Sequence, residues 1–283
     1  MSAVAVEQRR ARAGSFAAAW AFVKHHILTV YSILFFGYLL LPIGVVVLFS
    51  FNHPTGKFNY TWQGFTWDNW RYWNGVPGIQ GAIVLSLEIA LLASVVATAL
   101  GTLIALALVR YGFRGRASTN ILIFLPLSTP EIVLGASLLT LFLNLTFVTF
   151  GFQTILIAHI MFCISFAVVT VKARLVGFDR HLEEAAMDLG ANEWATFRKV
   201  TLPLTAPAIL AALLLCFAIS IDDFVVTYFN SGSSVTFPLF VWGAARIGAP
   251  PQVNVIGTAI FAIALTAMLV NVLVQMRRAK RAS

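Results

Sequence analysis

The sequence has little charge and little cysteine, and it lacks a nucleotide-binding motif. Only 11% of its 283 residues are charged, whereas a soluble domain carries about 25%, so a water-soluble globule is excluded. Its two cysteines, Cys163 and Cys216, both lie in apolar runs, which excludes a disulfide framework and a cysteine-based metal site. No G-x-x-x-x-G-K-[ST] phosphate-binding loop occurs, so this chain is not expected to hydrolyse ATP by itself.

Long apolar runs fill most of the chain, 59% of which is hydrophobic. A helix needs about 20 apolar residues to cross roughly 30 Å of hydrocarbon. The sequence therefore predicts an all-α membrane protein with six transmembrane helices, short tails at residues 1–26 and 277–283, and a charged loop at residues 172–203. The predicted spans are Ile27–Phe51, Gly81–Val109, Ile121–Leu143, Gly151–Val171, Leu204–Phe229 and Val253–Met276.

The basic residues predict the orientation of these spans, because cytoplasmic loops retain lysine and arginine. Sixteen of the 19 basic residues lie in the two tails, in the connection after the second span and in the loop at 172–203. Only Lys57, Arg71 and Arg246 fall on the opposite side. Both termini are therefore predicted to be cytoplasmic. The net charge of +8 follows from this topology, so nucleic acid is not expected as a partner.

The charged loop contains the stretch EEAAMDLGANEWATFRKVTLPLTAPAIL, from Glu183 to Leu210. Gly190 is suited to end a first helix, and Asn192 to cap a second. Pro203 and Pro207 are expected to stop that second helix and start the next span. Small and apolar residues recur at the spacing of one face of the first helix, namely Leu182, Ala185, Ala186 and Leu189.

This loop resembles the coupling loop of permease subunits of ATP-binding-cassette (ABC) importers. That loop has the form E-A-A, three residues, G, nine residues, I, one residue, L-P; here Glu184-Ala185-Ala186, Gly190 and Leu202-Pro203 match it, with Val200 in place of Ile. The resemblance implies a type I ABC importer permease, whose cytoplasmic coupling helix sits in a groove of the ATPase subunit. An interfacial amphipathic helix is the alternative. The implied coupling residues are Glu183, Glu184, Ala185, Ala186, Asp188, Leu189, Gly190 and Pro203.

The same resemblance implies the location and the partners of the chain. It places the chain in the cytoplasmic (inner) membrane of a bacterium, with a second permease subunit, two ABC ATPase subunits and an extracytoplasmic solute-binding protein. ATP and Mg²⁺ are then expected on the ATPase subunits, and this chain is expected to need no cofactor of its own.

Four acidic residues fall inside the predicted spans: Glu88, Glu131, Asp222 and Asp223. An ionised acid within the bilayer costs at least about 2.5 kcal/mol, so such residues usually face a transport pathway. At 1.5 Å per residue, all four would lie at middle to outer depth and line a route for a small cation. Three alternatives stay open: Glu131 caps a half-helix after Pro130, Asp222 and Asp223 lie at the outer surface, and Glu88 is hydrogen-bonded between helices.

The stretches LSTPEIVLGASLL, SIDDFVVTYFNSG and FTWDNWRYW resemble the polyamine branch of these permeases, which serves spermidine and putrescine. That resemblance agrees with the acidic layer, although branches for ferric iron or other small solutes share parts of the motifs. A self-sufficient proton-coupled transporter is the alternative from another class. No nucleophile–base or metal constellation indicates an enzyme.

Two further features carry narrower expectations. The aromatic-rich segment at residues 52–80 is either a belt at headgroup level or a docking surface for the solute-binding protein. His159, in the fourth predicted span, is expected to form hydrogen bonds between helices rather than to bind a metal.

Overall fold

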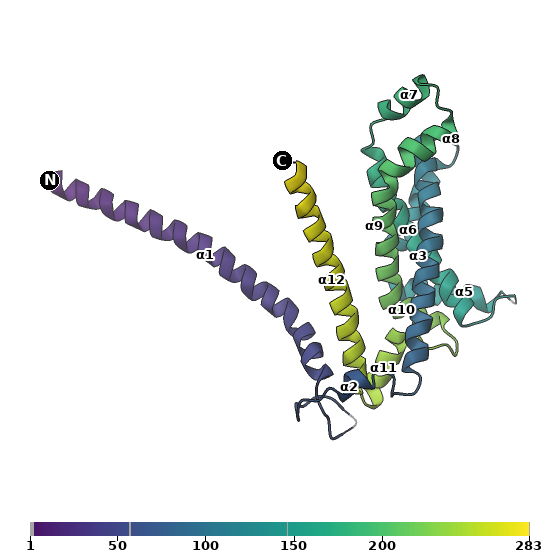
Figure 1. Cartoon of the computed structure of the whole chain (residues 1–283), viewed down its shortest axis with the longest axis horizontal. Helices are drawn as coiled ribbons and strands as arrows, with labels where there is room; N and C mark the ends of the chain where they lie inside the picture. Colours follow the sequence, from purple (N-terminus) through teal and green to yellow (C-terminus); the bar gives the residue numbers. More distant parts are fainter. Residues whose placement is uncertain (1–2, 57, 146, 283) are drawn as a thin grey trace. The chain divides into compact units, whose positions relative to one another are not determined.

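The computed structural model describes residues 3–56, 58–145 and 147–282, which divide into two compact units, residues 1–76 with 248–283 and residues 77–247 (Figure 1). Every named element is helical. The helices are α1 Ala3–Ser50, α2 Asp68–Arg71, α3 Ile79–Arg110, α4 Arg116–Ser128, α5 Glu131–Leu143, α6 Phe152–Val176, α7 His181–Asp188, α8 Glu193–Thr196, the π-helical turn η1 Phe197–Thr201, α9 Leu202–Asp222, α10 Val225–Asn230, α11 Phe237–Ile247 and α12 Pro251–Ala282.

The first unit contains the two terminal helices. Helix α1 runs for 48 residues from Ala3, so the predicted cytoplasmic tail is helical and continuous with the first span. Helix α12 packs against α1, where a Cβ added at Gly257 would lie 3.5 Å from Val46 Cγ1. The stretch His26–Ser50 of α1 has none of its most apolar window buried.

The segment after α1 folds around asparagine side chains. Asn52 Nδ2 donates to Asn59 Oδ1 at 2.6 Å, and Asn52 Oδ1 accepts from the amide of Gln63 at 2.8 Å. Asn69 Nδ2 donates to the Asn52 carbonyl at 2.7 Å. The ring of Trp67 packs edge-on against its aromatic neighbours but stays largely exposed. The hydrogen-bonded asparagines thus form the centre of this segment, and the ring of Trp67 lies on its outside. Both interpretations of the segment, an aromatic belt and a docking surface, require exposed rings.

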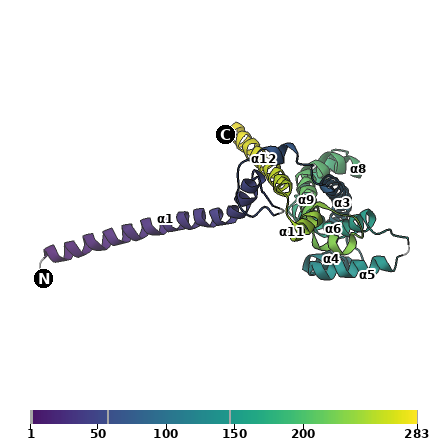
Figure 2. The ribbon, with the colours of Figure 1, turned by 90° about the horizontal axis from the view of Figure 1, so that it is seen from below.

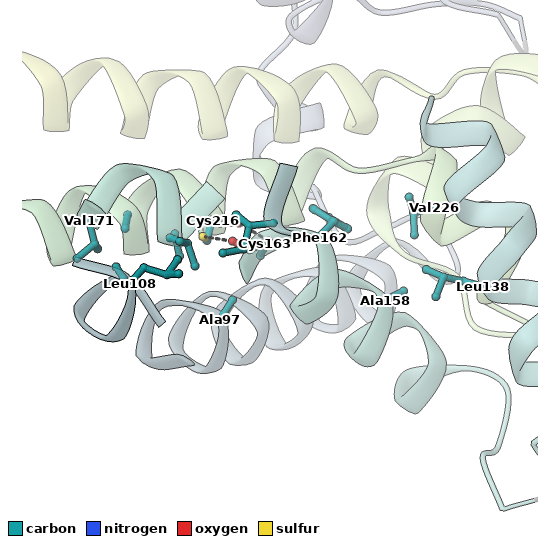
Figure 3. Packing of buried hydrophobic residues seen from close by; sticks show 14 of the residues in the cluster. Ala97, Leu108, Leu138, Ala158, Phe162, Cys163, Val171, Cys216 and Val226 are labelled. Atoms are coloured by element: carbon teal, nitrogen blue, oxygen red, sulfur yellow. Dashed lines mark hydrogen bonds between the residues drawn. The ribbon is translucent and has the colours of Figure 1, made fainter. Parts of the chain in front are cut away.

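In the second unit, α3, α6 and α9 pack side by side as a three-helix core (Figures 1 and 2). The core contains small side chains, including Ala97 and Cys216 (Figure 3) and also Ala167. Small residues let helix backbones approach closely in membranes. A Cβ at Gly101 would lie 2.5 Å from Ala167 Cβ, so glycine is required where α3 crosses α6. Cys163 and Cys216 are free thiols within this core, as predicted.

Four helical stretches of the described residues are long and apolar enough to cross a bilayer: His26–Ser50, Ile79–Arg110, Phe152–Val176 and Glu193–Asp222. The predicted third span is broken after Pro130, and Glu131 begins a new half-helix, as the sequence indicated. This span consists of α4 and α5, which meet at an angle of 110°, because Pro130 has no amide hydrogen and restricts the residue before it. The depth estimated for Glu131 assumed a straight helix and therefore does not apply.

Two predicted helix ends are also wrong. The expected stop at Pro203 is absent, since η1 and α9 follow α8 in one continuous helical run from Glu193 to Asp222. The π-turn at residues 197–201 ends two residues before Pro203, and local π adjustments can re-satisfy the backbone groups that a proline leaves without partners. The fifth predicted span was expected to reach Phe229, but it breaks at Asp223, whose backbone is extended. The chain resumes as the short helix α10.

Candidate functional site

The charged loop forms the predicted helix–turn–helix. Helix α7 ends at Asp188, and Gly190 has a left-handed backbone with φ of +89°. Gly190 N–H donates to the Met187 carbonyl at 2.9 Å, which closes the turn. Asn192 caps α8 by accepting a hydrogen bond from the amide of Ala195 at 2.8 Å, as the sequence predicted. Because left-handed backbone is unfavourable for residues with a Cβ, the turn depends on glycine at this position.

Most of the predicted coupling residues share the exposed side of α7. Glu184, Ala185, Asp188 and Leu189 are exposed, and Ala186 is half-buried. Leu189 is 90% exposed, and Trp194 on α8 also displays its ring to solvent. A charged loop that leaves large apolar side chains uncovered is typical of a surface that binds another protein.

Glu183 differs from these residues because it is buried against the rest of its own chain. Both of its carboxylate oxygens accept hydrogen bonds from the guanidinium of Arg110 at the end of α3. Thr201 Oγ1 in η1 also donates to Oε1. Burial acts to raise the pKa of Glu183, but the hydrogen bonds from Arg110 and Thr201 and the nearby positive charges outweigh it, so this pKa is lowered. Glu183 therefore stays ionised and holds α7 to the helices behind it.

At the other end of the three-helix core, three of the four predicted path acids line one cavity. We call it the acidic cavity; its volume is about 400 Å³, within the range of small-molecule sites. Glu131, Asp222 and Asp223 contribute to its wall, together with apolar and aromatic side chains. The other lining residues are Pro126, Leu127, Thr129, Leu134, Phe162, Phe166, Ile219, Phe224, Val225 and Val226.

Asp223 is the paired acid of this cavity. Its Oδ2 accepts from the amide and from the hydroxyl of Thr227, both at 2.8 Å, and so caps the start of α10. The same oxygen lies 3.3 Å from Nε2 of His159 on α6. The His159 ring also contacts Ser220 Oγ at 2.7 Å and Thr227 Oγ1 at 2.9 Å. The predicted role of His159 as a hydrogen-bonding residue between helices is confirmed.

Asp222 and Glu131 remain open to the acidic cavity. Asp222 is the last residue of α9 and Glu131 the first of α5, and both are exposed. In the part of the chain that the structure describes, neither carboxylate has a hydrogen-bonding side-chain partner. Ser128 and Thr129 donate to the carbonyls of the preceding turn at 3.0 and 2.7 Å, as expected for a proline-broken helix.

Glu88 does not join the other three acids. It lies on an exposed part of α3 and is absent from the wall of the acidic cavity. The acidic cavity therefore includes three of the four acids, and a place for Glu88 on the transport path stays a prediction. The spacing of residues along a helix predicts how deep a side chain lies in the membrane, but not in which direction it points around the helix axis. Depth alone therefore cannot show which side chains of separate helices lie close together.

Comparison with known proteins decides the family. Residues 97–277 match the model of the family described as binding-protein-dependent transport system inner membrane component. The spermidine/putrescine transport system permease protein PotC of Haemophilus influenzae is 40% identical over 242 residues, which cover 84% of this chain and 92% of that protein. The chain belongs to this family. The permease is also 37% identical over 246 residues to PotC of Escherichia coli K12, covering 87% and 92% of the two chains.

Solved structures show the same fold at lower identity. A bacterial ABC transporter for alginate contains a chain that is 14% identical to the permease, with a TM-score of 0.66 and coverage of 92% and 99%. A chain of an amino acid ABC transporter is 16% identical, with a TM-score of 0.55 and coverage of 76% and 99%. The permease thus has the fold of ABC importer membrane subunits, as the sequence predicted. It is a non-catalytic, multi-pass component of the inner membrane.

Two sets of residues at these sites have no signal in the sequence. In the sequence, Arg110 indicates only the orientation of the span that it ends. Its pairing with Glu183 corresponds to no local sequence pattern. The rings of Phe162, Phe166 and Phe224 beside the acids were indistinguishable from the many other apolar residues of the spans. Both sets become visible only when distant helices are placed together.

Proposed function

We propose that this permease forms part of the translocation path of an ATP-driven importer of polyamines, spermidine or putrescine. It acts with a second permease subunit, two ABC ATPase subunits and an extracytoplasmic solute-binding protein. ATP and Mg²⁺ are bound by the ATPase subunits, and both termini of the permease face the cytoplasm, because 16 of its 19 basic residues lie on that side.

The observation that carries the substrate proposal is the acidic cavity, in a chain 40% identical to a spermidine/putrescine permease. Asp222 and Glu131 offer two open carboxylates, which attract ammonium groups, and the neighbouring ring of Phe224 can bind a cation on its face. A polyamine combines separated ammonium groups with apolar methylene segments, so alternating acids and rings match its chemistry.

Support for the coupling role comes from the exposed side of α7 and from Gly190. The matched loop displays Glu184, Asp188 and Leu189 on a helix that a left-handed glycine turn holds in place. An ATPase subunit that binds this surface can convert its own closure into movement of the membrane helices, which is a two-state change biased by a ligand on a partner.

The test is reconstitution of the permease in liposomes with its sister permease, ATPase subunits and solute-binding protein. We expect uptake of radiolabelled spermidine or putrescine that requires ATP and the binding protein. Unlabelled polyamine should compete, and ferric iron should not.

Three results would contradict the proposal in different ways. Uptake by the permease alone along a proton gradient would replace the ATP-driven mechanism. Competition by ferric iron and not by polyamine would reject the substrate. ATP-dependent uptake that persists without any subunit bound to α7 would reject the coupling role.

A further inference from the structure

The large apolar side chains of helix α7 are poorly buried, since Leu182 and Met187 are 49% and 44% exposed. A cavity of about 560 Å³ lies beneath α7. Residues of α7, α8 and η1 line one side of this cavity, and residues at the end of α3 line the other. Across this space, Glu183 reaches Arg110 and Thr201, and Arg180 Nη2 donates to the Val109 carbonyl at 3.0 Å. Apolar packing therefore does little to hold α7, and the Glu183 carboxylate is its main anchor.

The contact between Glu183 and Arg110 fixes both the distance and the orientation of the two side chains. An arginine that donates two parallel hydrogen bonds to one carboxylate fixes the orientation of the pair as well as its length. The side chain of Glu183 is only 8% exposed, and separating a buried ion pair is strongly unfavourable. Arg110 also lies against the Phe178 ring, with 5.6 Å from the guanidinium carbon to the ring centroid. Helix α7 and the end of α3 must therefore move together.

The anchor connects α7 to two long helices. Arg110 is the last residue of α3, which packs against α6 and α9 through the small-residue core. Thr201 ends η1, from which α9 continues to Asp222 at the acidic cavity. Through Thr201, Glu183 is thus connected by continuous helix to Asp222, the acid that faces the cavity. A displacement of α7 can be transmitted along this helix.

We propose that the Glu183–Arg110 ion pair is the link through which movement of α7 reaches α3 and α9. Glu183 and Arg110 are positioning residues, and they bind neither ATP nor the transported solute. This inference rests on the proposed coupling role of α7 and adds the connection inside the permease that the role requires. The ATPase subunit binds the exposed side of α7. The buried Glu183 then transmits the movement of α7 to α3 and α9.

A charge-exchange series in the complete importer tests the link. The variants are Glu183→Arg, Arg110→Glu, the double exchange, and Glu183→Gln, which removes the charge and keeps the shape. Each is assayed for co-purification of the ATPase subunits, for ATP hydrolysis stimulated by the binding protein, and for polyamine taken up per ATP hydrolysed. Asp179→Asn is the matched control, since it removes a carboxylate near α7 that is exposed.

We expect each single exchange to lower uptake per ATP by roughly 5-fold to 150-fold, the range of typical coupling energies. Glu183→Gln should lower it by less, and the double exchange should restore most of it. ATPase subunits should still co-purify with every variant, because the exposed side of α7 is unchanged. Asp179→Asn should match the wild type. The ratio of uptake to hydrolysis separates a link from a merely structural role, which would lower both together.

The proposal is overturned if Glu183→Gln keeps the wild-type ratio of uptake to ATP, or if the double exchange recovers nothing while the ATPase subunits remain bound. Loss of ATPase binding in Glu183→Gln would also overturn it, since Glu183 would then belong to the docking surface. A failure of the proposed function is distinguishable, because the wild-type importer itself would then show no ATP-dependent uptake.

Discussion

The coupling loop and the acidic cavity each contain two adjacent acids, and in each place one acid is paired while the other is open. Glu183 is buried against an arginine and a threonine, and Glu184 beside it is exposed. Asp223 contacts a histidine and caps a helix, and Asp222 beside it faces the cavity. The paired acid holds the local structure, which leaves its neighbour available to a partner or a solute.

The two paired acids differ in the chemistry of their partners. Glu183 binds an arginine, which is charged at every physiological pH and forms a two-point contact. Asp223 binds a network of His159 and Thr227 inside the membrane segment, where every polar group needs a partner. We infer that the first arrangement serves the transfer of movement and the second the maintenance of a helix break.

The largest effect is expected from breaking the Asp223 network. In Asp223→Ala, His159 loses its carboxylate and the amide and hydroxyl of Thr227 lose their acceptor, and each buried donor left unsatisfied costs about 1–3 kcal/mol. The importer should melt at a clearly lower temperature and should be recovered in smaller amounts. Asp222→Ala is the control, and it should melt like the wild type. Equal melting of the two variants would contradict the distinction between paired and open acids.

The second prediction concerns the open acid of the coupling loop. Glu184→Lys reverses a charge on the exposed side of α7 and should abolish stimulated ATP hydrolysis while the permease still inserts and melts normally. Replacing Gly190 by valine should act similarly, because left-handed backbone costs a residue with a Cβ about 1–2 kcal/mol and nothing else crowds the site. Glu184→Gln should be milder. Normal stimulated hydrolysis in both Glu184→Lys and the Gly190 variant would reject the docking role.

A smaller effect is expected at the open acid of the cavity. Asp222→Asn removes one charge from the wall, and a hydrogen bond to a charged group contributes about 1.5–3 kcal/mol, so the KM for polyamine uptake should rise by about 10-fold or more. The assembly of the ATPase subunits and the melting temperature should not change. The concentration dependence of radiolabelled spermidine uptake measures this. An unchanged KM in Asp222→Asn and also in Glu131→Gln would exclude both acids from the path.

Features set by neighbouring residues could be predicted from the sequence. The turn at Gly190 and the cap at Asn192 depend on backbone preferences within one or two turns of helix. The start of α5 at Glu131 follows from the proline before it. The membrane class and the family motif were equally local, since they rest on apolar runs and fixed spacing.

Features set by distant residues could not be predicted. Glu183 and Glu184 have the same chemistry and lie next to each other, and only the position of Arg110, 73 residues earlier, decides which of them is buried. Asp222 and Asp223 differ because the helix ends at Asp222 and the backbone of Asp223 is extended. A periodic pattern assumes an unbroken helix, so it fails at a break, which is where the acidic cavity lies.

The smallest effect is expected at the His181–Asp179 pair. Like Glu183–Arg110, it joins a basic and an acidic side chain, but it is exposed. His181 Nδ1 and Asp179 Oδ1 are 2.7 Å apart, and both side chains are exposed. Hydrogen bonding to Asp179 raises the pKa of His181 above its ordinary value of 6.5, and the same hydrogen bond lowers the pKa of Asp179. Because the pKa of His181 is raised in the folded state, its stabilising contribution is present below pH 6.5 and is lost as the pH rises through the folded pKa.

Solvent and salt screen such a pair, so His181→Gln should leave the melting temperature and the stimulated ATP hydrolysis at wild-type values on both sides of pH 6.5. The Glu183 variants should take up less polyamine per ATP over the whole of this pH range, because the pKa of Glu183 in the wild type is lowered from 4.5 and the lost carboxylate is ionised throughout. Melting curves, hydrolysis rates and uptake per ATP measured across this range compare the two pairs directly. A pH-dependent loss of hydrolysis in the wild type that disappears in His181→Gln would show that the exposed pair also contributes to coupling, and burial would then not be what distinguishes Glu183.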